Sequence, residues 1–103
     1  MIKLSVLFPD GQDKCFDFPY YYDKHIPLIK QLIGPRCLTM AVEQGIAGAA
    51  PGTKAAYVMM NHFYFRTLND FHSSFALHAS VIMSDIINFT DTYPVIQISE
   101  VKI

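Results

Sequence analysis

The sequence of 103 residues has few charged residues, few cysteines and no long apolar run. Lysine and arginine together number 8 and are scattered, so no basic patch predicts binding to nucleic acid. The apolar N-terminal run contains Lys3 and Ser5 and is too short for a secretion signal, and no segment approaches the length that spans a membrane. We therefore expect a cytoplasmic protein that binds neither nucleic acid nor membrane.

Metal-binding patterns are also missing. Cys15 and Cys37 form no C-x-x-C pair and have no histidine at zinc-finger spacing, so we expect two reduced thiols. No two histidines have the H-x-x-x-H or H-x-H spacing that metal sites on helices and strands use. We expect no metal and no other cofactor.

The residues that are present predict one small α+β domain over residues 1–103. Alternating apolar residues and turn signals indicate four strands, at residues 2–8, 36–47, 55–65 and 94–103. Asp17 as N-cap and Gly34 as stop delimit a first helix, and Thr67 with Asp70 resembles a capping box that opens a second helix over residues 68–78. A further short helix is predicted over residues 80–89.

This order of elements, β-α-β-β-α-β, is typical of the ferredoxin-like fold, a four-stranded antiparallel sheet with helices on one face. The third strand is apolar at both parities, with Met59, Phe63 and Phe65 on one side and Val58, Met60 and Tyr64 on the other. Because no chain remains to cover the second face, we expect a homodimer in which two sheets meet face to face.

Polar residues gather on the apolar side of the first helix. Tyr21 and Tyr22 precede His25 by one turn, and Pro27 has no N–H to donate, so we expect a widened turn between Asp23 and Leu28 that makes room for a polar pocket. The same spacing fits a core histidine that bonds to a backbone carbonyl and tyrosines that only pack. Both interpretations stay open.

Asn61 and His62 are adjacent polar residues in the apolar third strand, so one faces the helices and the other the opposite side. The residue that faces the helices is expected to line the His25 pocket, or else to form a hydrogen bond within the dimer. For Asp85, which lies on the short apolar helix, we expect a structural role in the turn that follows.

Three stretches, "YYYDKHIPLIKQLIG", "FYFRTLNDF" and "SDIINFTDTYPVIQISEV", resemble the EthD-like family, which is named for its association with ethyl tert-butyl ether degradation. The resemblance implies a dimeric α+β barrel, the superfamily of polyketide cyclases, antibiotic-biosynthesis monooxygenases, muconolactone isomerases and haem-dependent chlorite dismutases. Only the family's histidine on the first helix carries over, to His25. The resemblance does not choose a reaction.

Two hypotheses of function follow. In the first, His25 is a general acid or base that acts on an apolar, oxygenated small molecule held by Tyr21, Tyr22, Asn61 and His62. Isomerisation, cyclisation and decarboxylation need only such proton transfers, and the resemblance adds cofactor-independent monooxygenation. In the second, the protein is a non-catalytic binding or accessory protein of a degradation or biosynthesis pathway. Haem ligation by His25 is a weaker third idea.

Overall fold

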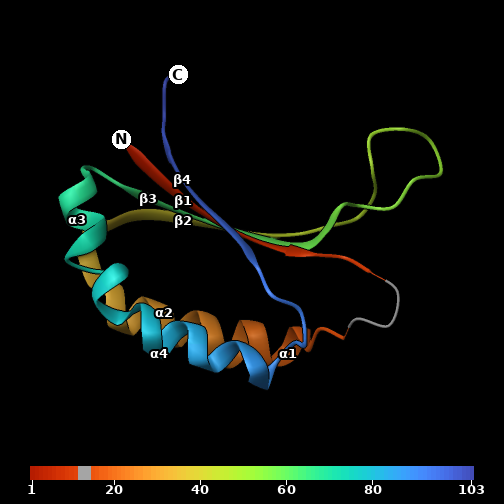
Figure 1. The fold of residues 1–103 in the computed structure, drawn as a ribbon, viewed down its shortest axis with the longest axis horizontal. Helices are drawn as coiled ribbons and strands as arrows, with labels where there is room; N and C mark the ends of the chain where they lie inside the picture. The colour runs from red at the N-terminus through yellow and green to blue at the C-terminus, as the bar shows by residue number, and fades with distance from the viewer. Residues whose placement is uncertain (12–14) are drawn as a thin grey trace.

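The computed structural model describes residues 1–11 and 15–103, which form a four-stranded sheet with helices on one face (Figure 1). All neighbouring strands are antiparallel, and the strand order is β2-β3-β1-β4. The strands are β1 (Ile2–Pro9), β2 (Cys37–Gln44), β3 (Tyr57–Phe65) and β4 (Val95–Glu100). The predicted α+β fold is confirmed, whereas the dimeric barrel requires a second copy and stays a prediction.

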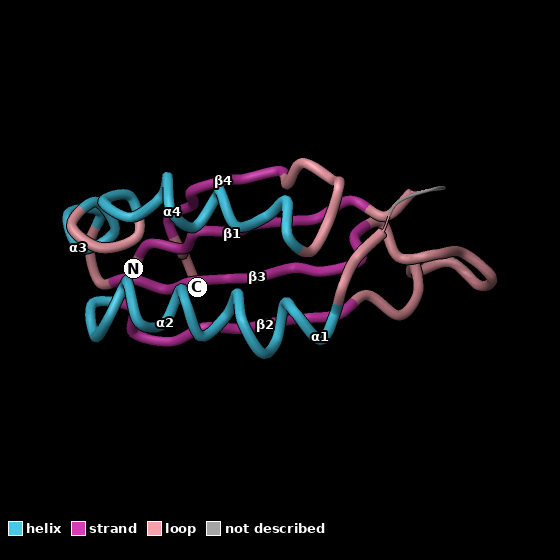
Figure 2. The backbone as a smooth tube through the Cα atoms, turned by 90° about the horizontal axis from the view of Figure 1, so that it is seen from below, coloured by secondary structure: helices cyan, strands magenta, loops and turns pink. Residues whose placement is uncertain are grey.

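The first helical segment runs along the strand direction over β2 and β3 (Figure 2). It consists of α1 (Phe18–Tyr20), η1 (Tyr21–His25), α2 (Ile26–Ile33) and η2 (Gly34–Arg36). The Asp17 side chain accepts the N–H of Tyr20 at 3.0 Å, so the predicted N-cap is confirmed. Gly34 has φ 62°, a conformation that glycine adopts without strain, and it ends α2 as predicted.

The turn at η1 is wider than an α-helical turn. The N–H of Ile26 donates to the carbonyl of Tyr21, five residues back, which is the π-helical pattern. Pro27 follows immediately and has no N–H with which to continue an α-helical ladder. A widened turn was predicted between Asp23 and Leu28, and this is confirmed only in part, because the turn runs from Tyr21 to His25 and regular α-helix begins at Ile26. The turn leaves both Tyr21 and His25 buried.

The second helical segment is more broken than its sequence suggests. It consists of α3 (Leu68–His72), η3 (Ala76–His78), α4 (Ala79–Ser84) and η4 (Asp85–Asn88). Thr67 caps α3 by accepting the N–H of Asp70, but the predicted continuous helix over residues 68–78 is wrong, since α3 ends at His72. The hydroxyl of Ser74 donates to the carbonyl of Asp70 at 2.6 Å and so competes with the helical ladder.

Three strands are shorter than predicted, and one of them, β3, begins at Tyr57 instead of Ala55. β2 ends at Gln44 instead of Ala47, and a Cβ on the next residue, Gly45, would lie only 2.1 Å from the carbonyl oxygen of Tyr57. β4 ends at Glu100 instead of Ile103, and one further hydrogen bond joins the N–H of Val101 to the carbonyl of Met1 at 2.9 Å.

The parity of β3 decides which side chains the helices cover. Met59, Asn61, Phe63 and Phe65 face the helices and are at most 1% exposed. Val58, Met60, His62 and Tyr64 face the opposite side, where their cross-strand neighbours are residues such as Ser5, Leu7 and Glu43. Within the described residues no element covers that second face (Figure 1).

We expect Asp17→Ala to lower the free energy of unfolding by about 1 kcal/mol, because the N–H of Tyr20 loses its acceptor. Urea unfolding followed by circular dichroism measures this difference. Asp17→Asn is the matched control, since it keeps an oxygen that can accept the same bond. Equal losses in the two variants would contradict the assignment of Asp17 as N-cap.

Candidate functional site

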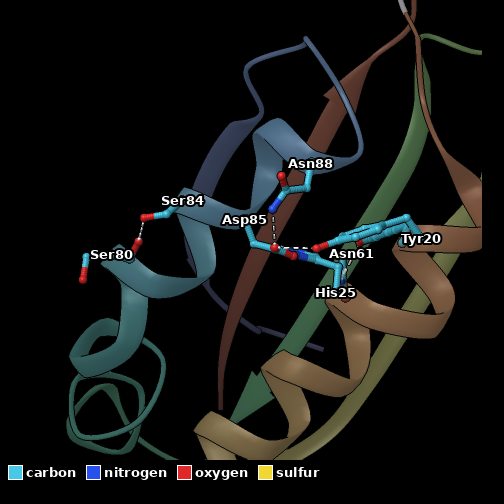
Figure 3. A network of polar contacts seen from close by, with 8 residues as sticks. Tyr20, His25, Asn61, Ser80, Ser84, Asp85 and Asn88 are labelled. Atoms are coloured by element: carbon cyan, nitrogen blue, oxygen red, sulfur yellow. Dashed lines mark hydrogen bonds and ion pairs between the residues drawn. The ribbon is translucent and has the colours of Figure 1, made fainter.

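The carboxylate of Asp85 accepts hydrogen bonds from both helical segments (Figure 3). Its Oδ2 lies 2.9 Å from Nδ1 of His25, and its Oδ1 accepts the hydroxyl of Tyr20 at 2.7 Å and the side-chain amide of Asn88 at 2.9 Å. Asp85 is the first residue of η4, while Tyr20 and His25 lie on α1 and η1. This one side chain therefore ties the two helical segments together.

Burial and hydrogen bonding act in opposite directions on Asp85. Partial burial raises the pKa of its carboxyl group, but the hydrogen bonds from Asn88, His25 and Tyr20 outweigh that effect, so the pKa is lowered. Asp85 is therefore a carboxylate at neutral pH. The same carboxylate raises the pKa of the Tyr20 hydroxyl through their hydrogen bond.

His25 is neutral at the same pH. Burial lowers the pKa of its imidazole below the ordinary value of 6.5, and the hydrogen bond and charge of Asp85 only partly compensate. A neutral imidazole beside a carboxylate places its proton on Nδ1, which donates to Asp85. Its other nitrogen, Nε2, then carries a lone pair and has no hydrogen-bond partner among the described residues.

A second polar pair lies beside His25. The side-chain amide of Asn61 donates to the hydroxyl oxygen of Tyr21 at 2.9 Å, and both residues are 1% exposed. Burial raises the pKa of Tyr21 far above its ordinary value, so its hydroxyl keeps its proton. Among the described residues, the Oδ1 atom of Asn61 is buried and has no hydrogen-bond partner, an unusual situation that costs about 1–3 kcal/mol.

His25, Tyr21 and Asn61 line one internal cavity between the first helical segment and the sheet. Its volume is about 10 Å³, which is close to the space that one water molecule needs. The remaining lining residues are apolar: Val6, Phe8, Ile29, Phe63, Phe75, Ile82, Met83 and Ile86. The structure thus places three of the five predicted site residues around one cavity that is polar at one end.

The other two predicted site residues lie elsewhere. Tyr22 is 41% exposed and donates its hydroxyl to Gln44 on β2 at 2.9 Å, because the widened turn directs Tyr21 rather than Tyr22 inward. His62 faces the opposite side of the sheet, since its neighbour Asn61 takes the helix-facing position. There His62 contacts Ser5 at 3.0 Å and Glu43 at 3.4 Å.

Aromatic rings surround the His25 imidazole and the Tyr21 ring. The ring centre of Phe89 lies 4.5 Å from that of His25 and 5.2 Å from that of Tyr21, and Phe8 and Phe16 contact Tyr21 edge-on. The rings of Phe89 and Tyr21 pack against the imidazole and contribute to the burial that lowers the pKa of His25. The polar groups of the site therefore act in an apolar environment.

Sequence reasoning missed the contact of Asp85 with His25 and the participation of Tyr20. The two ends of the Asp85–His25 contact are 60 residues apart in sequence, so no local spacing signals it. The part of the Asp85 prediction that holds is its bond with Asn88, three residues on in the following turn. A histidine and an aspartate on two predicted helices that cover the same sheet face were the only available signal.

The described residues contain no group of three or more histidine, cysteine, aspartate or glutamate side chains that could hold a metal ion. Cys15 is exposed and Cys37 is half-buried, and neither takes part in a disulfide. No helix in the described part of the chain has the length and apolar character needed to cross a membrane.

Comparison with known proteins places the fold in a named family. A profile of the EthD domain matches residues 10–93. An EthD-like protein from Ralstonia eutropha JMP134 has 39% sequence identity and a TM-score of 0.90, over 99% of this chain and 92% of that protein. A comparison with curated protein sequences found no match.

Two more distant structures share the fold. An ethyl tert-butyl ether degradation (EthD) family protein from Bacillus halodurans C-125 has 20% identity and a TM-score of 0.75, over 99% of each chain. HapK from Hahella chejuensis has 11% identity and a TM-score of 0.56, over 99% of this chain and 93% of HapK. At these identities the likeness concerns the fold alone.

We expect the His25 imidazole to titrate below pH 6.5 and Asp85→Asn to lower this midpoint further. The reason is that the variant loses the negative charge that favours the imidazolium, whereas burial still opposes it. Nitrogen-15 NMR of histidine-labelled protein measures the midpoint and shows which ring nitrogen carries the proton. Asp23→Asn removes an exposed charge on the same turn and is the control. A midpoint that Asp85→Asn leaves unchanged would disprove the coupling.

Proposed function

The chain belongs to the EthD family, and from this membership and the site geometry we propose that His25 transfers protons to and from a neutral, apolar, oxygenated small molecule. The observation that carries the proposal is the 2.9 Å contact between Nδ1 of His25 and the Asp85 carboxylate. It fixes the ring and leaves Nε2 as the basic atom, beside a cavity that Tyr21 and Asn61 also line.

His25 is suited to act as a general base. Its imidazole is neutral at pH 7, so Nε2 can take a proton without first losing one. The imidazolium that forms is stabilised by Asp85, which stays ionised. Asp85 therefore acts through His25 as a positioning residue and has no contact of its own with the cavity.

Tyr21 and Asn61 supply the complementary polar groups. The Tyr21 oxygen accepts a bond from Asn61, and its own O–H proton is still available to donate to a substrate oxygen. Because burial keeps the Tyr21 hydroxyl protonated, it can stabilise negative charge that develops on that oxygen. The free Oδ1 of Asn61 accepts a hydrogen bond from a substrate hydroxyl.

The reaction class that fits these groups is proton transfer next to a carbonyl. Nε2 of His25 takes the proton from the carbon adjacent to the carbonyl, and the C–H electron pair forms the enolate, whose oxygen accepts the Tyr21 hydroxyl. The imidazolium then returns its proton to carbon or oxygen. Isomerisation and enolate-based cyclisation both include this step, and it needs no cofactor.

We test this step with 2-tetralone, a neutral aromatic ketone, by following exchange of its α-protons for deuterium by NMR. His25→Gln should lower the protein-dependent exchange rate by about two to four orders of magnitude. The rate should also fall as the pH drops through the lowered pKa of His25, because the base becomes protonated. His62→Gln, which changes the histidine on the other face, should retain the wild-type rate.

Full exchange activity in His25→Gln would disprove the catalytic role. A second candidate function is a binding protein without turnover. The cavity beside His25 has only about 10 Å³, so a ligand held outside it would not react unless side chains move. Saturable binding of 2-tetralone with no protein-dependent exchange would support that second function.

The proposal also includes a homodimer built sheet against sheet. The face of the sheet away from the helices carries apolar side chains, including Leu7, Val58, Met60 and Tyr64, that no described element covers. His62 on the same face is already paired with Ser5 and Glu43, so its polar atoms do not oppose burial. A second copy with the same face would bury these side chains.

We expect Met60→Asp to convert the dimer to monomer, because two carboxylates would enter an apolar interface. Sedimentation equilibrium at micromolar concentration measures the mass. Val81→Asp is the control, since Val81 is half exposed on α4, in the helical layer. A monomeric wild-type protein would refute the dimer, and dissociation by Val81→Asp alone would place the interface on the helices.

A further inference from the structure

A large apolar groove opens between η4 and β4, outside the internal cavity. Its volume is about 730 Å³, within the range of small-molecule sites in proteins. The apolar side chains that line it are Met83, Ile86, Ile87, Tyr93, Pro94 and Ile96. Ile87 and Tyr93 are 83% and 91% exposed, so the groove presents apolar surface to solvent.

The groove exists because the helices leave the edge of the sheet uncovered. Ile96 pairs with Val6, so the two side chains share the helix-facing side of the sheet. Val6 is 7% exposed, whereas Ile96 is 43% exposed. The α4–η4 segment therefore covers β1 more fully than β4, and the space beyond it is left open (Figure 2).

The groove and the internal cavity share a wall. Met83 and Ile86 line both spaces, and each is half-buried. Methionine has three rotatable bonds and no branch, so Met83 can change its position at little cost. A molecule in the groove is therefore separated from His25, Tyr21 and Asn61 by these two side chains.

The charges of both spaces restrict what can bind. Neither set of lining residues contains a lysine or an arginine, whereas Asp91 lies at the groove and Asp85 is bonded to His25. An anionic ligand such as a carboxylate or a phosphate ester would lack a partner and be repelled. A neutral ligand avoids both costs.

We infer that this groove holds the apolar body of a neutral ligand whose hydroxyl or carbonyl end displaces Met83 to reach His25, Tyr21 and Asn61. The inference rests on the proposed function and names the substrate class of that site. The unpartnered Oδ1 of Asn61, in a residue that is 1% exposed, is the independent sign that a polar group is missing from the inner end. The substrates are uncharged aromatic or alicyclic alcohols and ketones.

We test the inference with 2-naphthol, a neutral alcohol that has the shape of the enol of 2-tetralone, and with the 2-naphthoate anion as the charged counterpart. Calorimetry measures binding, and the NMR signal of the His25 imidazole reports whether the ligand reaches it. Wild-type protein should bind 2-naphthol with a shift of that signal and should bind 2-naphthoate at least about ten-fold more weakly.

Variants separate the groove from the inner site. Ile87→Asp places a charge in the groove at an exposed position and should weaken 2-naphthol binding by about ten-fold or more. Leu77→Asp is the matched control, because Leu77 is 69% exposed but lies outside the groove, and it should bind as wild type does. Met83→Ala removes part of the shared wall and should strengthen binding or increase the His25 shift.

Each failure has its own signature. If 2-naphthol shifts the His25 signal but Ile87→Asp binds it as tightly as wild type, the groove inference is overturned and the proposed function stands. If Ile87→Asp weakens binding but the His25 signal never moves, the groove does not lead to His25 and the inference is again overturned. If 2-naphthol does not bind and Ile87→Asp dissociates a dimer, the groove belongs to a contact between copies, which also overturns it.

Discussion

The hydrogen bonds to the Asp85 carboxylate are the contacts on which the arrangement of the helical layer depends. Tyr20 and His25 come from the first helical segment and Asn88 from the second, so one side chain fixes the two segments relative to each other. These hydrogen bonds are strong because their acceptor is a charged carboxylate and only 14% of the Asp85 side chain is exposed. Without these bonds, neither ring nitrogen of the buried His25 would have a hydrogen-bond partner among the described residues, and the two segments would contact each other mainly through apolar side chains.

The site combines groups that are unfavourable for stability with a fold that tolerates them. A neutral histidine, a protonated tyrosine and an asparagine with a free oxygen lie among aromatic rings, where leucine or phenylalanine would pack without loss. The free Asn61 oxygen alone costs about 1–3 kcal/mol, a noticeable part of the stability of a small domain. The proposal of a ligand site rests on these polar groups, which are buried at such a cost around one cavity.

The sequence predicted those features that depend on local chemistry. The cap at Asp17, the stop at Gly34 and the widened turn before Pro27 each follow from backbone groups within a few residues, and all are present. Features that depend on tertiary contacts were not predictable. The break after His72 accompanies a hydrogen bond from the Ser74 hydroxyl to the Asp70 carbonyl, where solvent is the alternative partner. The pairing of Asp85 with His25 forms only when the two helical segments pack side by side. Alternation along the strand shows that Asn61 and His62 face opposite sides of the sheet, but not which of them faces the helices. The register of β1 against β3 decides this, because Asn61 pairs with Val6 and His62 pairs with Ser5.

The position of the site also determines which part of the fold must move for a ligand to reach it. The first helical segment has eight residues of regular helix in α2 behind His25, with Ile29 and Ile33 buried in the core. The opposite wall, which contains Met83 and Ile86, belongs to a six-residue helix followed by a four-residue 3₁₀ turn, whose hydrogen-bond geometry is poorer. Displacing Met83 therefore disturbs fewer backbone bonds than displacing any residue of α2. Because Asp85 lies between Met83 and Ile86 in sequence, the residue whose carboxylate orients His25 also belongs to the segment that separates the cavity from the groove.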